Sequence, residues 1–187
     1  MPINTLAEAE AEKVQEILKK NPLLAFSIYT HSQVQFLEQT ASKIETILEE
    51  GIEGNTIQGG CFTEAYGLFW LWVLGAYEVV RTMSQNGECF DQGLRDRIAE
   101  IKCYLKRLRI PFAKQELPRW NRKDQVRPIW GELSVTDIDT ENKDLRFRIE
   151  DRPLSARNSL ERFRKFISSI ELTCVNGKIP TGSGPDT

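Results

Sequence analysis

The sequence contains a single histidine, His31, and this scarcity excludes several kinds of active site. A metal site built from several histidines of one chain is impossible, and so is any histidine mechanism that does not use His31. The four cysteines, Cys61, Cys89, Cys103 and Cys174, form no C-x-x-C pair, so a closed zinc site has no support. We therefore expect neither a metal ion nor a cofactor.

Long apolar runs are missing as well. The longest uncharged apolar stretch lies between Glu64 and Glu78, and it is shorter than the ~20 residues that a membrane-spanning helix needs. Residues 1–12 are acidic rather than basic, which argues against a secretory leader. We expect a cytoplasmic protein that does not contact a membrane and whose thiols are free.

Neither sign of charge dominates, because 25 lysines and arginines stand against 27 aspartates and glutamates, for a formal net charge of -2. This balance argues against a globally basic nucleic-acid-binding protein. The charges are nevertheless segregated along the chain. Residues 1–60 hold nine glutamates, four lysines and no arginine, whereas residues 102–127 hold nine basic side chains against Glu116 and Asp124. The folded protein is therefore expected to be electrostatically polarised.

The composition is that of one ordinary folded domain, with 187 residues of which 40% are hydrophobic and 28% charged. The pattern predicts a mainly α fold: a bundle of about four helices with an appended antiparallel β-hairpin and a C-terminal helix. We expect a single domain over residues 1–175, with the hairpin at about 129–150. Residues 176–187 are rich in glycine and proline and are predicted to form a disordered tail.

Capping and breaking residues set the expected bounds of the helices. The predicted helices run from after Thr5 to Lys20, from Leu23 to Glu50, from Thr63 to Ser84, from Asp91 to Arg109 and from Ser155 to Ile170. Asp91 is expected to cap the fourth helix, and Pro111 is expected to stop it. Residues 51–60 contain four glycines and are predicted to be a loop.

The periodicity changes from helical to alternating after Val126. Apolar residues then alternate with polar ones, at Leu133 and Val135 and again at Leu145, Phe147 and Ile149. The intervening residues 140–144 are typical of a turn, so this segment predicts a hairpin with one buried face.

The basic segment is the first candidate binding site. We call its proposed binding residues the basic strip: Arg107, Arg109, Lys114, Arg119, Trp120, Arg122, Lys123 and Arg127. Cations beside aromatic rings can bind phosphates and stack on bases, so the basic strip indicates a nucleic acid or an acidic protein as partner. The alternative is that these charges neutralise the acidic N-terminal half, within the chain or across a dimer.

The third predicted helix supplies a second candidate site. At about 100° per residue, Tyr66, Trp70, Tyr77 and Arg81 fall within one sector of roughly 60°. One interpretation is the edge of a core helix, with Arg81 paired to Glu78 one turn earlier. The other interpretation is a ligand slot lined by aromatic rings, in which Arg81 binds a small anion.

Residues 23–116 resemble HEPN-type proteins. The resemblance is carried by the order of four helices, by the helix from Tyr66 to Arg81, and by the segment from Leu105 to Glu116. It implies a helical bundle that usually dimerises; active members are metal-independent RNases with an R-x4-6-H motif, and many others only bind partners or nucleic acid. The matching place is Arg109-Ile110-Pro111-Phe112-Ala113-Lys114, where lysine stands in place of histidine.

Three functions are consistent with these observations. The favoured one is a non-enzymatic binding or accessory protein that uses the basic strip. The first alternative is a HEPN-like RNase in which Arg109 stabilises the charge of a phosphorane-like state and Lys114 replaces histidine, which requires a desolvated lysine. The second alternative is a sensor of a small anion or ligand that uses the aromatic sector.

Overall fold

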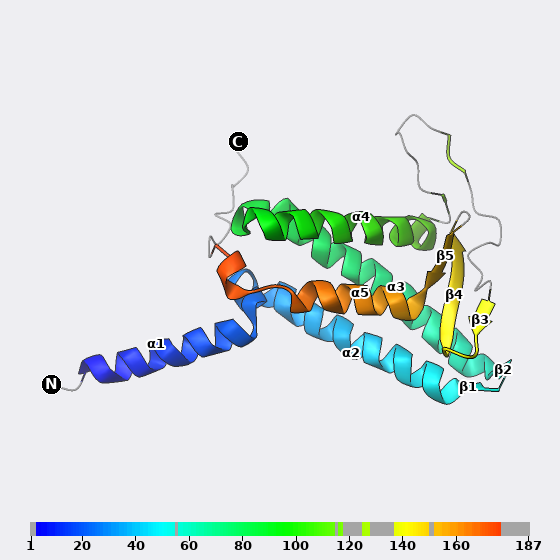
Figure 1. Ribbon diagram of the computed structural model, residues 1–187, viewed down its shortest axis with the longest axis horizontal. Helices are drawn as coiled ribbons and strands as arrows, with labels where there is room; N and C mark the ends of the chain where they lie inside the picture. Colours follow the sequence, from blue (N-terminus) through cyan, green and yellow to red (C-terminus); the bar gives the residue numbers. More distant parts are fainter. Residues whose placement is uncertain are drawn as a thin grey trace, which may run out of the picture.

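In the computed structural model, the fold is mainly helical, with a small antiparallel sheet at one end (Figure 1). The structure describes residues 3–54, 56–114, 116–117, 125–127, 137–149 and 152–176. The mainly α fold with an antiparallel β element and a C-terminal helix is thus confirmed.

The described helices form a bundle from which the first helix projects (Figure 1). The α-helices are α1 (Ile3–Lys20), α2 (Ile28–Gly51), α3 (Gly59–Gln85), α4 (Gln92–Lys114) and α5 (Ala156–Ser168). Short 3-10 helices are η1 (Pro22–Ala25), η2 (Gly87–Cys89) and η3 (Leu172–Cys174). Helices α2, α3 and α4 follow one another as antiparallel neighbours, and α5 lies across the side that they leave open.

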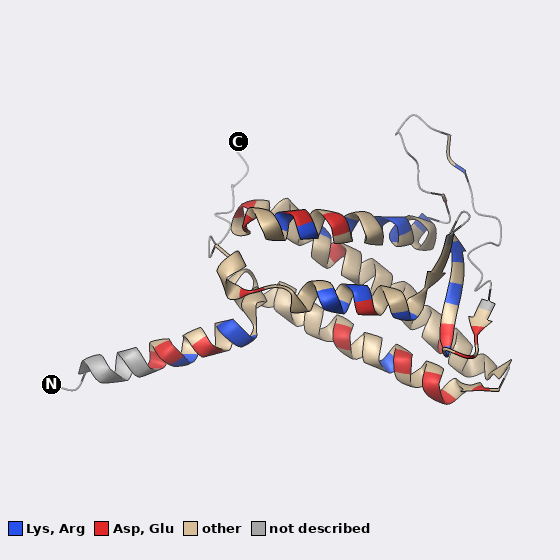
Figure 2. Ribbon diagram, viewed as in Figure 1, with Lys and Arg blue, Asp and Glu red and all other residues tan. Residues whose placement is uncertain are grey.

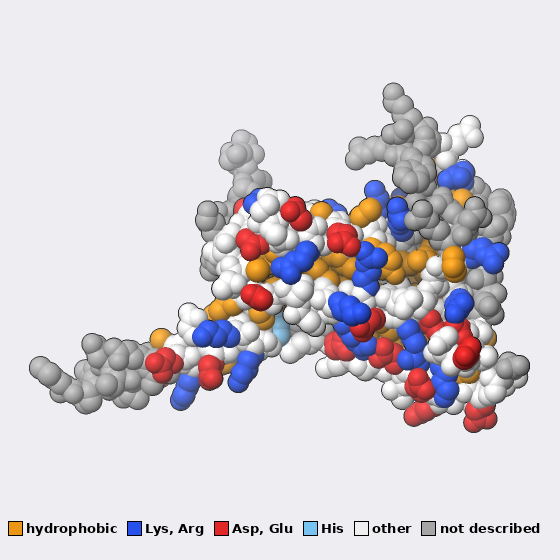
Figure 3. Space-filling model, viewed as in Figure 1, with side chains coloured by type: hydrophobic (Ala, Val, Ile, Leu, Met, Phe, Trp, Pro, Cys, Tyr) orange, Lys and Arg blue, Asp and Glu red, His pale blue; other side chains and the backbone are white. Residues whose placement is uncertain are grey.

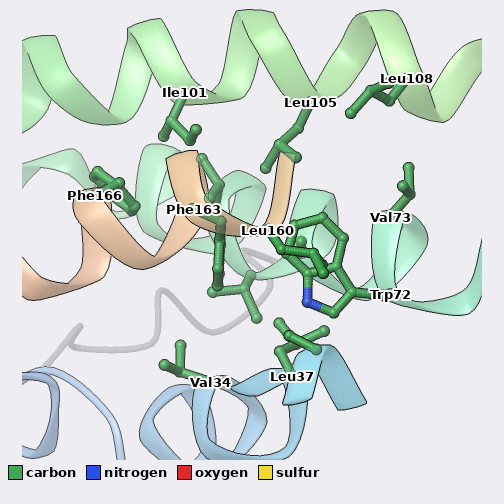
Figure 4. Packing of buried hydrophobic residues seen from close by; sticks show 14 of the residues in the cluster. Val34, Leu37, Trp72, Val73, Ile101, Leu105, Leu108, Leu160, Phe163 and Phe166 are labelled. Carbon is green, nitrogen blue, oxygen red and sulfur yellow. The ribbon is translucent and has the colours of Figure 1, made fainter. Parts of the chain in front are cut away.

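The core is completed by α5. Its buried side chains Leu160, Phe163 and Phe166 point between α2, α3 and α4 (Figure 4). Phe163 meets the buried ring of Trp72 edge to face, with ring centroids 5.4 Å apart. Burying rings of this size dominates core energetics, at about 25 cal/mol per Å² of apolar surface. The C-terminal helix is therefore part of the core rather than an appendage to it.

The sheet contains three described strands in the order β3-β4-β5: β3 (Asp137–Asp139), β4 (Asp144–Ile149) and β5 (Arg152–Ser155). The turn between β3 and β4 falls where the hairpin is predicted, and Lys143 adopts a left-handed conformation there, with φ 48°. The predicted first-strand residues Leu133 and Val135 lie outside the described residues. Strand β5 was not expected, because four residues that lead into a helix carry no alternation of their own.

The expectation of one helix from Leu23 to Glu50 is wrong. The chain forms η1 first, and α2 begins only after Ser27, whose hydroxyl accepts a hydrogen bond from the backbone N–H of Thr30 at 3.3 Å. The break turns Leu23 and Phe26 into the core, where the ring of Phe26 lies 4.8 Å from that of Phe90. A capping serine and two anchored apolar side chains outweigh the helical spacing here.

The predicted loop at residues 51–60 is shorter and more structured than expected. It holds two strands of two residues each, β1 (Ile52–Glu53) and β2 (Thr56–Ile57), which pair antiparallel. Helix α3 then begins at Gly59, before the predicted start at Thr63. Gly51 is required by a close approach, since a Cβ atom at this position would lie 2.5 Å from the Cβ of Cys61.

The expectation that Pro111 stops the fourth helix is also wrong, because α4 continues to Lys114. Pro111 is buried, and the ring of Phe112 packs 5.8 Å from Phe69 and 5.3 Å from Phe147. The indole N–H of Trp70 donates to the carbonyl of Phe112 at 2.9 Å. A proline inside a helix costs about 3 kcal/mol, and burying a phenylalanine ring in this cluster offsets a cost of that size.

The C-terminal end of the described chain is held against the start of α4. Val175 forms a β-bridge with Phe90, and the backbone N–H of Asn176 donates to Cys89 at 2.8 Å. The remainder of the predicted tail, residues 177–187, lies outside the described residues. The four cysteines are free thiols, as expected.

Asp91 caps α4, as predicted, and this cap makes stability depend on pH. Its carboxylate accepts from the backbone N–H of Leu94 at 2.6 Å. That hydrogen bond, and next one from Cys174, hold the pKa of Asp91 below its ordinary value of 3.8. A group whose pKa is lower in the folded state stabilises the fold above its unfolded pKa, and this stabilisation is lost as the pH falls through the folded pKa.

We therefore expect the free energy of unfolding to fall as the pH drops below about 4. Part of this fall should be absent in Asp91→Asn, because asparagine still caps a helix but does not titrate. Urea unfolding between pH 2.5 and 6, followed by circular dichroism, measures both profiles. Parallel profiles for the two proteins would contradict this assignment.

Candidate functional site

The end of α4 presents cations that no described carboxylate neutralises. Lys106, Arg107 and Lys114 are exposed, and none of them forms an ion pair or side-chain hydrogen bond within the part of the chain that the structure describes. Basic side chains gather over this end of the molecule in Figures 2 and 3. We take these three residues as the centre of the candidate site.

Arg127 joins the same end of the molecule. The backbone N–H of Leu117, three positions after Lys114, donates to the carbonyl of Arg127 at 2.8 Å. The side chain of Arg127 is exposed. This hydrogen bond brings the backbone at Arg127 close to the C-terminal end of α4, and the basic strip as a binding site stays a prediction. The other members of the basic strip lie outside the described residues: Arg119, Trp120, Arg122 and Lys123.

Arg109 differs from the rest of the basic strip. Its guanidinium lies 5.0 Å from the centre of the Tyr77 ring, and its Nε is 3.9 Å from a carboxylate oxygen of Glu78. The side chain is half-buried between α3 and α4. We therefore assign Arg109 to the contact between these helices, and its role as a binding residue stays a prediction.

Two glutamates of α2 pair with an arginine of α5. Arg164 of α5 binds Glu45 through two hydrogen bonds of 2.6 and 2.9 Å and also pairs with Glu38 at 2.8 Å. The hydrogen bonds that Arg164 donates to Glu45 raise the pKa of the guanidinium above its ordinary value, although burial opposes the charge. The geometry is the bidentate fork that makes arginine–carboxylate pairs strong.

The same holds closer to the sheet, where Glu49 binds two cations. Arg157 approaches Glu49 at 2.7 Å and Lys143 at 3.3 Å. The hydrogen bond from Lys143, followed by the charges of both cations, holds the pKa of Glu49 below its ordinary value. Glu38, Glu45 and Glu49 of α2 thus pair with cations of α5 and the hairpin, not with those at the end of α4. Neutralisation within the chain does not account for Lys106, Arg107 and Lys114.

The aromatic sector of α3 forms the contact with α4 and the sheet. The ring of Tyr66 lies 6.2 Å from those of Phe112 and Phe147. As already described, Trp70 donates to α4 and Tyr77 lies beneath Arg109. Arg81 pairs with Glu78 at 2.6 Å, as expected. This arrangement favours the edge of a core helix, and the small-anion sensor stays a prediction that no described contact supports.

Arg109 and Lys114 do not converge on one point. They are five positions apart on α4, which separates them by about 140° around the helix. Arg109 faces α3, whereas Lys114 is exposed and not desolvated. A catalytic pair must reach the same phosphate, so this separation gives the RNase alternative no support.

Arg148 is an exposed cation that the basic strip does not include. The hairpin places Arg146 and Arg148 on the exposed face of β4. Arg146 pairs with Asp139, but Arg148 has no ion-pair partner among the described residues. The alternation of arginine with Phe147 predicts which face both residues occupy, but only the turn geometry shows which of them is paired.

Other chemistry has little basis in the described residues. No three of their histidine, cysteine, aspartate and glutamate side chains are grouped so that they could hold a metal ion. None of the described helices combines the length and apolar character that crossing a membrane requires. The HEPN resemblance stays a prediction from the sequence. Comparison with known proteins finds no family model, no curated protein and no solved structure that matches this chain.

Proposed function

We propose that this protein is a non-enzymatic binding protein that holds the phosphate backbone of a single-stranded nucleic acid on the basic end of α4. One observation supports the proposal above all: Lys106, Arg107 and Lys114 are exposed and form no ion pair among the described residues, while Glu38, Glu45 and Glu49 of α2 pair with other cations. Unpaired cations on a rigid helix can release the counterions of a polyanion without first breaking ion pairs of their own.

The spacing of these cations fits a backbone rather than a single anion. Arg107 and Lys114 are seven positions apart, so they share one face of α4 and lie about 10 Å apart along its axis. Successive nucleotides of a stacked strand advance by about 3.4 Å, so this distance spans about three of them. Arg127 extends the cationic surface beyond the end of the helix. The remaining members of the basic strip, with Trp120 among them, are proposed to contribute stacking.

The test is fluorescence anisotropy of labelled single-stranded RNA and DNA, titrated with protein at several salt concentrations. The double variant Arg107→Ala/Lys114→Ala should bind about tenfold more weakly at physiological salt. Its slope of log K against log salt should be shallower by about 1.4, because two phosphate contacts are lost. The matched control is Lys19→Ala/Arg95→Ala, which removes two exposed cations that form no ion pair with any described residue, and it should leave both quantities nearly unchanged.

Equal weakening in both double variants would show that only net charge matters and would refute a defined site. No binding at either extreme of salt would refute the nucleic-acid proposal and leave an acidic protein as the partner to seek. The same samples are run on a gel to examine the probe. Cleaved probe, with cleavage lost in Arg109→Ala, would instead establish the RNase alternative.

A further inference from the structure

A second surface, on the outer side of α2 and α3, is apolar and uncovered. Lys43 of α2 and Glu64 of α3 form an ion pair of 2.7 Å that fixes how the two antiparallel helices face each other. Seven positions from this pair, in the same direction along the bundle, lie Phe36 on α2 and Leu71 on α3. Positions seven apart share one face of a helix, so Phe36 and Leu71 lie side by side.

This surface exposes much more apolar area than a lone surface residue would. Phe36 is 68% exposed and Leu71 55% exposed, and Tyr29, a further seven positions along α2, is 80% exposed. We call Tyr29, Phe36 and Leu71 the outer α2–α3 face. Clustered exposed apolar side chains in a folded protein mark an interaction site.

Helix α1 also exposes apolar side chains. It projects from the bundle (Figure 1), and Val14 and Ile17, three positions apart on one side of it, are 53% and 52% exposed. A helix of 18 residues is marginally stable alone in water and depends on the packing of its apolar side. Within the part of the chain that the structure describes, α1 packs mainly against η1.

We propose that α1 of one copy packs its apolar side onto the outer α2–α3 face of a second copy, and that the exchange is reciprocal in a twofold dimer. This inference does not depend on the proposed function. A twofold arrangement makes the same contact twice, and closed twofold dimers are the commonest oligomers.

The junction after α1 explains why the partner is a second copy and not the same chain. The backbone N–H of Asn21 donates to the carbonyl of Ile17 at 2.9 Å, and the next residues are anchored by the buried side chain of Leu23. Lys19 and Lys20 border a hollow of about 300 Å³ against the end of α5. These contacts direct α1 away from its own bundle, as Figure 1 shows.

The dimensions agree with this arrangement. A helix about 27 Å long and about 10 Å wide, exchanged twice, gives a total buried area of about 1,100 Å², near the lower limit of specific interfaces.

The experiment is sedimentation velocity of the full chain over a concentration series. The wild type should sediment as a species of twice 21.5 kDa. Val14→Glu/Ile17→Glu and, separately, Phe36→Glu should each be monomeric while keeping the wild-type circular dichroism spectrum, because the substituted side chains are exposed. The matched control is Ile28→Glu, an equally exposed apolar residue of α2 that points about 100° away from Tyr29, and it should remain dimeric.

The decisive measurement mixes the two monomeric variants, Val14→Glu/Ile17→Glu and Phe36→Glu. One intact α1 and one intact outer α2–α3 face remain in the mixed pair, so a heterodimer should form at a weaker affinity than that of the wild type. A dimer made by two outer α2–α3 faces would not be restored by mixing and would tolerate Val14→Glu/Ile17→Glu. Either of these results, or a monomeric wild type, would overturn the proposal.

Discussion

Replacing Phe69 with alanine is expected to lower the free energy of unfolding by about 3–5 kcal/mol. Phe69 is fully buried on α3 and holds three elements together. Its ring stacks on Phe147 of β4 at 5.2 Å, meets Phe112 of α4 edge to face at 5.8 Å, and lies parallel to Trp72 at 6.0 Å. Alanine leaves a cavity that rigid neighbours on three elements cannot close.

Urea unfolding at pH 7, followed by circular dichroism, measures this loss. Phe69→Leu is the control, because it keeps most of the side-chain volume and should lose less than half as much stability. A loss below about 1 kcal/mol for Phe69→Ala would show that the cluster relaxes around the gap, contrary to the packing seen here.

Asp144→Ala is expected to be nearly as damaging, with a loss of about 2–4 kcal/mol. The carboxylate is buried at the start of β4 and joins the sheet to the first turn of α5. One oxygen accepts from the hydroxyl of Ser155, and the other accepts from the backbone N–H of Arg157 at 3.0 Å. With alanine at this buried position, the hydroxyl of Ser155 and the backbone N–H of Arg157 both lose their acceptor.

A double-mutant cycle distinguishes this network from simple loss of the side chain. Asp144→Ala and Ser155→Ala should be non-additive by about 1 kcal/mol or more, because each substitution removes the same hydrogen bond. Asp144→Asn keeps an acceptor for Arg157 and should retain over half of the stability that alanine loses. Additive losses in urea unfolding would mean that the two residues act independently.

The sequence predicts the elements of this fold better than it predicts their ends. Asp91 caps α4 as expected, and the last helix begins close to its predicted start, because a capping side chain acts within its own turn. The prediction that Pro111 ends the helix fails because α4 continues beyond it to bury Phe112. That burial depends on residues of α3 and β4, which the local sequence does not show. Strand β5 is likewise defined by pairing with β4 rather than by a pattern of its own.

The sequence predicts which segment carries the basic side chains of the candidate site, but not which of those side chains are available to a partner. Counting charges identifies the basic segment, yet it cannot separate Arg107, which is unpaired, from Arg109, which lies between Tyr77 and Glu78. Nor can it show that Glu45 pairs with Arg164, because the two residues are 119 positions apart in the chain. Whether a cation is available to a partner depends on such distant pairings, which only the fold supplies.

The position of α5 has a consequence for the order in which the chain is completed during synthesis. Its apolar side chains fill the space between α2, α3 and α4, and its Arg164 pairs with Glu38, 126 positions earlier. At about 5–20 residues per second, a ribosome takes about 4–17 s to pass from the end of α3 to the end of α5. For those seconds the nascent chain carries an open apolar groove around Trp72, a transient substrate for chaperones that α5 closes last.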